Sequence, residues 1–198
     1  MFNRFISAAF AASVAMAGTS SVAIAETDVP FALDWKFEGP SAPYFHAIDA
    51  GIFAEADLNV TITEGDIRTF DFTTMPAGYK VVANIPYYLT SNLIRLLADT
   101  PNKPSVTALL IQKEVAERIC ASPGQMGLLS VIAQLYFDCS LDIEVPATYF
   151  TPPPKVDSQV VVLKKREKLP FDIDEKQFLR VVKAGFSEKR KTLRNALS

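Results

Sequence analysis

The sequence has little of what metal sites and disulfide scaffolds require. It contains one histidine, His46, and two cysteines, Cys120 and Cys139, in 198 residues. A single histidine leaves little for Ser-His-Asp catalysis and nothing for a His-rich metal site. Two cysteines without a Cys-x-x-Cys pair predict buried thiols rather than a disulfide framework. We therefore expect no resident metal.

The sequence also lacks an apolar run long enough to cross a membrane. Its first apolar stretch begins at Phe5 and ends near Gly18, which is about 14 residues where a span needs roughly 20. A positive start at residues 1–4 precedes the stretch, and an A-x-A site at Ala23–Ala25 follows it. This pattern predicts a signal peptide over residues 1–25, cleaved after Ala25, which would direct the chain to the periplasm.

The net charge of −2 conceals an uneven distribution along the chain. Residues 1–64 hold two basic and eight acidic side chains, whereas residues 155–198 hold twelve basic and six acidic ones. The C-terminal segment is therefore where we expect an anionic partner to bind.

Residues 26–64 are predicted to form a small βαβ unit. Apolar alternation indicates strands over 31–35 and 58–62, and helical spacing indicates a helix over 43–56. The string DWKFEGPSAPYFHAIDAGIFAEADLNVTI resembles the start of periplasmic substrate-binding proteins of the thiamine-precursor and nitrate/taurine transport type. That resemblance implies ligand contacts from the strand-helix turn, and the alternative is that these side chains only pack. The candidates are Trp35, Tyr44 and His46.

Residues 65–198 alternate strand and helix patterns. This order predicts an α/β fold with a parallel sheet that a hairpin completes. The first strand, over 79–85, is apolar enough to be buried on both faces. Ligands of open sheets bind at the carboxyl ends of the strands, where Asp66 and Asn84 are expected. The later strands are predicted over 106–111, 140–145 and 158–163, and the helices over 89–98, 113–119 and 127–137.

Asn84-Ile85-Pro86-Tyr87 directly follows this first strand. Pro86 cannot continue the ladder, so we expect a rigid turn with Asn84 and Tyr87 exposed. The Asn84 side-chain oxygen and an adjacent backbone carbonyl could accept the two N–H bonds of an adenine amine. Tyr87 could stack on the base. The pattern therefore suits adenine amino-group methylation, although the same residues are common in ordinary turns.

Three longer motifs accompany this turn, at Gln112–Arg118, Phe150–Ser158 and Phe186–Asn195. Together, in this order, they resemble the ribosomal RNA adenine dimethyltransferase family. The resemblance implies a Rossmann-like class I methyltransferase sheet and the start of a small C-terminal helical domain. It also implies S-adenosylmethionine as cofactor and the adjacent adenines of small-subunit rRNA as substrate, which would place the enzyme in the cytoplasm.

The resemblance assigns a role to each matching position. The implied catalytic and base-pocket residues are Asn84, Pro86, Tyr87 and Phe150. Asp66 matches the acceptor of the cofactor adenine amine, with Ile67 and Asn84 beside the cofactor. The basic residues that suit RNA phosphates are Lys155, Arg190, Lys191 and Arg194, although a basic helix end is usually a solvated face.

The sequence departs from this family at its N-terminal side. The glycines before Asp66 stand at positions 18, 39, 51 and 65, and none forms the G-x-G loop that lets a backbone approach the methionine part of the cofactor. We therefore expect a chimeric chain whose first methyltransferase strands are replaced. Its parts are a signal peptide (1–25), a solute-binding-like βαβ fragment (26–64), a methyltransferase core (65–165) and a basic helical segment (166–198).

Three interpretations remain open from the sequence. The first is an rRNA adenine dimethyltransferase that the missing loop leaves incomplete. The second is a periplasmic solute-binding protein, and the third is an RNA-binding chimera without catalysis.

Overall fold

A computed structural model describes residues 27–33 and 42–187. The predicted signal peptide, over residues 1–25, lies outside the described residues. The chain divides into two compact units, residues 1–64 and residues 65–198. In the described residues no helix is long and apolar enough to span a membrane.

The first unit contains a strand, a helix and a strand in the predicted order. Strands β1 (Thr27–Leu33) and β2 (Leu58–Glu64) pair in parallel, and the helix between them is α1 (Ala42–Asp49). The predicted helix was too long, because the chain turns at Gly51, whose φ of 72° is left-handed, before the short 3-10 helix η2 (Ala54–Ala56).

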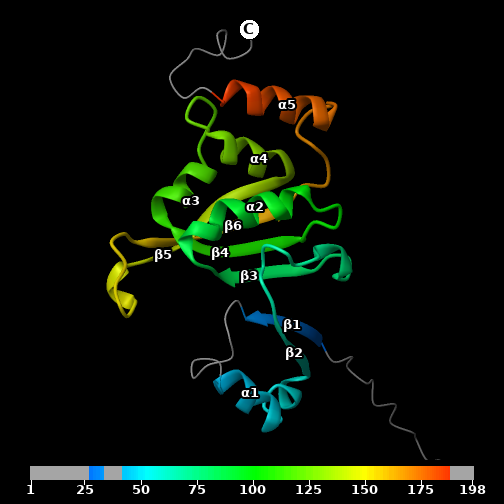
Figure 1. Cartoon of the computed structure of the whole chain (residues 1–198), viewed down its shortest axis with the longest axis vertical. Helices are drawn as coiled ribbons and strands as arrows, with labels where there is room; N and C mark the ends of the chain where they lie inside the picture. Colours follow the sequence, from blue (N-terminus) through cyan, green and yellow to red (C-terminus); the bar gives the residue numbers. More distant parts are fainter. Residues whose placement is uncertain (1–26, 34–41, 188–198) are drawn as a thin grey trace, which may run out of the picture. The chain divides into compact units, whose positions relative to one another are not determined.

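The second unit contains every strand and helix predicted for residues 79–163. Its sheet has the strand order β3-β4-β6-β5 (Figure 1). Strands β3 and β4 are parallel, and β6 is antiparallel to both β4 and β5, so the closing pair is confirmed and the sheet is mixed. The strands are β3 (Lys80–Asn84), β4 (Val106–Gln112), β5 (Phe137–Val145) and β6 (Ser158–Lys165).

Helices lie over one side of this sheet, and the last of them, which follows β6, packs on the helix before it (Figure 1). The α-helices are α2 (Thr90–Asp99), α3 (Lys113–Ile119), α4 (Leu128–Tyr136) and α5 (Glu175–Gly185). The shorter 3-10 helices are η3 (Phe72–Thr74), η4 (Tyr87–Leu89) and η5 (Ala147–Tyr149).

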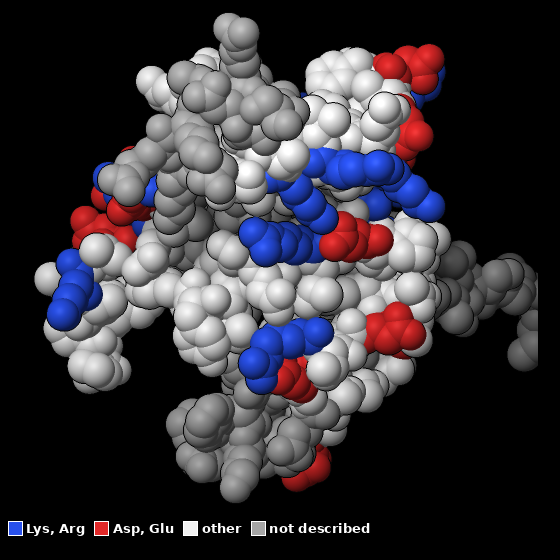
Figure 2. All heavy atoms as spheres, turned by 45° about the horizontal axis from the view of Figure 1, so that its top comes forward, with Lys and Arg blue, Asp and Glu red and all other residues white. Residues whose placement is uncertain are grey.

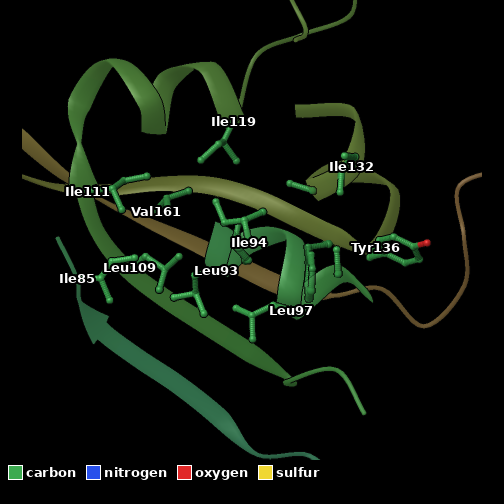
Figure 3. Packing of buried hydrophobic residues seen from close by; sticks show 14 of the residues in the cluster. Ile85, Leu93, Ile94, Leu97, Leu109, Ile111, Ile119, Ile132, Tyr136 and Val161 are labelled. Carbon is green, nitrogen blue, oxygen red and sulfur yellow. The ribbon is translucent and has the colours of Figure 1, made fainter. Parts of the chain in front are cut away.

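The hydrophobic core lies between these helices and one face of the sheet. Leu93, Ile94 and Leu97 of α2 are almost completely buried, and they pack over Leu109 and its neighbours on β4 (Figure 3). Their spacing of one, three and four residues places them on one face of the helix. This packing fixes the start of α2, and therefore the turn that precedes it.

The prediction that the first core strand is buried on both faces was wrong. Val81 and Ala83 of β3 pack against the core, but Val82 between them is 86% exposed. Successive side chains of a strand point to opposite faces. Within the described residues β3 is the edge strand, and its second face has no covering layer.

The two cysteines are free and half-buried. Burial raises the pKa of both thiols, that of Cys139 to about 12. Both side chains are therefore neutral thiols near pH 7.

We expect Leu97→Ala to lower the free energy of unfolding by about 2–5 kcal/mol, because it empties a fully buried position. Urea denaturation followed by circular dichroism measures this change. Arg95→Ala is the matched control, since Arg95 is exposed on the same helix and its removal should cost less than about 0.5 kcal/mol. Equal effects from the two variants would contradict this description of the core.

Candidate functional site

The candidate site begins where β3 ends. Asn84 is the last residue of β3 and is exposed, whereas the next residue, Ile85, is buried in the core. Pro86 has a φ of −53° and starts the 3-10 helix η4. The buried Ile85 side chain anchors the turn, and Pro86 ends the strand. The predicted rigid turn is therefore present, with Asn84 open to solvent.

Tyr87 is tied to a distant part of the sheet. Its hydroxyl lies 2.7 Å from the hydroxyl of Ser158, the fully buried first residue of β6. The ring itself is half-buried. This hydrogen bond holds the ring of Tyr87 in place while part of its surface stays accessible, as a stacking residue requires.

Phe150 lies in the connection between β5 and β6 and is half-buried. The connection is held by Asp157, whose carboxylate accepts the Ala147 backbone N–H at 2.9 Å. The Asp157 carbonyl also accepts the N–H of Lys113 at 3.0 Å. Because Asp157 immediately precedes Ser158, the segments that carry Tyr87 and Phe150 are both fastened to the start of β6. Lys155, in the same connection, is exposed.

Asp66 is exposed in the turn after β2, and its carboxylate is already engaged. It accepts the backbone N–H and the Nε–H of Arg68, each at 2.9 Å, and forms a salt bridge with the guanidinium. These hydrogen bonds lower the pKa of Asp66 to about 2. The pKa of Arg68 is raised, first by its side-chain hydrogen bonds to Asp66 and then by the charge of that carboxylate. Ile67, between the two, packs against the core.

Several predicted residues are not brought into this site. Trp35, Arg190, Lys191 and Arg194 lie outside the described residues. Tyr44 and His46 are exposed on α1, in the first unit. The ring of Tyr44 lies 4.6 Å from that of Phe31, which agrees with the packing alternative for this residue.

The sequence analysis missed Arg68, Tyr88 and Ser158. Ser158 belonged to a recognised motif, but nothing in the sequence indicated that its hydroxyl bonds Tyr87. A separate pocket of about 190 Å³ was also missed, and no predicted residue lines it. The residues lining this pocket are Arg95, Asp99, Leu128, Ile132, Leu179 and Lys183.

Charged side chains are unevenly distributed over the surface of the molecule. On the face drawn in Figure 2, lysine and arginine side chains gather in a band beside individual acidic residues.

Solved structures similar to this chain define its class. A dimethyladenosine transferase from Plasmodium falciparum superposes with a TM-score of 0.68 at 27% identity, covering 85% of this chain and 58% of that one. The 23S rRNA methyltransferase ErmE superposes with a TM-score of 0.63 at 19% identity, covering 87% of this chain and 75% of that one, and supports the fold alone. The second unit therefore has the Rossmann-like fold of class I rRNA methyltransferases, as predicted.

Sequence relatives identify the family. The family model described as ribosomal RNA adenine dimethylase matches residues 51–198, so the chain belongs to that family. Two proteins named ribosomal RNA small subunit methyltransferase A are similar to it. That of Syntrophotalea carbinolica is 36% identical over 170 residues, covering 80% of this chain and 64% of the relative. That of Lactobacillus delbrueckii subsp. bulgaricus is 46% identical over 153 residues, covering 72% and 51%.

These matches bear on two earlier expectations. The chain spans about half to two thirds of the length of these relatives. The family match begins at residue 51, upstream of the predicted start at residue 65. The alternative function of a periplasmic solute-binding protein has no support from these relatives.

We expect Tyr87→Phe and Ser158→Ala to be non-additive. Each change removes one side of the 2.7 Å hydrogen bond, so a double-mutant cycle of unfolding free energies should give a coupling of about 0.5–1.5 kcal/mol. Additive effects would show that the two hydroxyls do not interact in solution.

We expect Arg68→Ala to raise the pKa of Asp66 from about 2 toward its ordinary value of 3.8. The pKa is lowered in the folded chain, so any stability from this pair is present above pH 3.8 and is lost as the pH falls toward 2. An NMR titration of the Asp66 side-chain carboxyl measures the shift. Arg95→Ala should leave it unchanged, and an equally low pKa in Arg68→Ala would contradict the assignment.

Proposed function

We propose that this chain binds a target adenine of small-subunit rRNA at its Asn84-Ile85-Pro86-Tyr87 turn and presents the adenine amine for N6-methylation. The observation that carries this proposal is the anchored turn itself. Asn84 is exposed at the carboxyl end of β3, and Tyr87 is fixed by Ser158. Ligands of open α/β sheets bind at this edge.

The chemistry needs hydrogen-bond acceptors more than a base. The adenine amine is a poor nucleophile because its lone pair is delocalised into the ring. Asn84 Oδ1 and a neighbouring backbone carbonyl would accept its two N–H bonds, which favours a tetrahedral nitrogen with an available lone pair. Tyr87 and Phe150 would hold the base by stacking, and solvent would take the proton that the amine loses.

The described residues fit one end of S-adenosylmethionine. When bound, this cofactor supplies an electrophilic methyl group. Asp66, with Ile67 and Asn84, would offer an acceptor for its adenine amine, once Arg68 releases part of the carboxylate. The sequence upstream has no G-x-G loop for the methionine end. We therefore infer weak cofactor binding centred on Asp66.

The basic side chains near the C-terminus would hold the RNA backbone. Lys155 is exposed in the connection that carries Phe150. Arg190, Lys191 and Arg194 continue the basic segment and are proposed as further phosphate contacts. We assign the target-base site and Lys155 to a methyltransferase core over residues 65–165, and the rest of this RNA surface to residues 166–198. Because rRNA and the methyl donor are cytoplasmic, we propose that the methyltransferase function is exercised there, against the export that the signal peptide would direct.

A second candidate is RNA binding without methyl transfer. Two observations favour it: the missing G-x-G loop and the engagement of the Asp66 carboxylate by Arg68. Such a chimera would bind rRNA in a salt-dependent way and leave it unmodified.

The test is methyl transfer from labelled S-adenosylmethionine to small-subunit particles that lack the modification, with cofactor binding measured by calorimetry. We expect transfer by the wild-type chain and a loss of about 10²–10³-fold in Asn84→Ala, since one acceptor of the reacting amine is removed.

Asn92→Ala, at an exposed position of α2, is the matched control and should transfer normally. Particle binding without transfer by the wild-type chain would establish the second candidate. The absence of particle binding by a folded chain would reject both functions.

A further inference from the structure

Two exposed tyrosines flank the proposed base-binding residues. Tyr88 is 78% exposed and follows the half-buried Tyr87, whereas Tyr149 is 80% exposed and precedes the half-buried Phe150. Large aromatic side chains are usually much more buried. The same pattern therefore occurs twice: a half-buried aromatic residue is followed or preceded by a solvent-exposed one.

Both tyrosines stand on well-fixed backbone. Tyr88 lies within η4, between hydrogen-bonded Tyr87 and the buried Leu89, whose N–H donates to the Pro86 carbonyl at 2.9 Å. When such a ring binds a ligand, the entropy cost is small, because the backbone is already ordered and only the side-chain rotamers must be fixed.

Tyr149 is held in a comparable way at the end of η5. Its N–H donates to the Pro146 carbonyl at 3.0 Å, and the carboxylate of Asp157 accepts the N–H of Ala147 in the same turn. Its ring makes no contribution to the buried core. The fold therefore presents this ring to solvent from a fixed position.

One exposed cation shares a connection with one of these rings. Lys155 lies in the connection that carries Tyr149. An aromatic ring and a cation on one segment match a nucleotide, which has a base to stack and a phosphate to neutralise.

We propose that Tyr88 and Tyr149 stack on the nucleotides that flank the target adenine in the RNA. This inference rests on the proposed function, and it extends the site from one base to a short RNA segment. Tyr87 and Phe150 hold the target base, and Tyr88 and Tyr149 hold its neighbours on either side.

The experiment measures the affinity of the full chain for a small-subunit rRNA hairpin that contains two adjacent adenines, by fluorescence anisotropy over a series of salt concentrations. We expect Tyr88→Ala and Tyr149→Ala each to weaken binding on the order of 10-fold. The salt slope should stay unchanged, because neither variant removes a cation. Tyr88→Phe and Tyr149→Phe should bind like the wild type, since the ring remains.

Tyr44→Ala is the matched control, because Tyr44 is an aromatic residue 39% exposed on α1 of the first unit, and neither the proposed base site nor the proposed RNA surface includes it. Circular dichroism confirms that each variant is folded. Wild-type-like affinity in both alanine variants would overturn this inference and leave the proposed function intact. A wild-type chain that does not bind the hairpin would overturn both. Alanine variants that change self-association, measured by sedimentation, without changing RNA affinity would assign the tyrosines to a protein contact instead.

Discussion

The hydrogen bond between Tyr87 and the buried Ser158 joins the two halves of the candidate site. Tyr87 follows the edge strand β3, whereas Ser158 begins β6, which lies two positions further into the sheet. Asp157, next to Ser158, holds the connection that carries Phe150. The start of β6 therefore positions both aromatic residues, and any disturbance there would move the two together. A polar contact in this buried position is stabilising only while both partners are present.

Helices of the second unit bury one face of its sheet. The helices α2, α3 and α4 bury alternate residues of β3, β4 and β6, and the other residues of β3 have no covering layer in the described part of the chain. This asymmetry explains the exposed Val82 in a strand whose sequence is suited to burial. An apolar edge of this kind is a site at which other chains can pair.

The proposed role of the Asp66 carboxylate makes two demands that conflict: it must be ionised, and its oxygens must be free to accept hydrogen bonds. In the proposed cofactor role the carboxylate must be ionised, and its hydrogen bonds to Arg68 keep its pKa low, at about 2. The same guanidinium occupies the oxygens that an adenine amine would use. Arg68 is exposed, so solvent screens the pair and the rearrangement needs little energy.

The sequence by itself determined the elements and the family. Apolar periodicity located the strands and helices of residues 79–163, and the motifs around Asn84, Phe150 and Phe186 indicated an rRNA adenine dimethyltransferase. These features are local, because periodicity and turn chemistry depend on residues that are close in the chain. The tertiary structure decided which distant groups meet. The bond from Tyr87 to Ser158 and the exposure of Val82 both depend on strand order and on which face the helices cover. No local pattern in the chain encodes them, because pairing across a sheet is fixed only when the whole core packs.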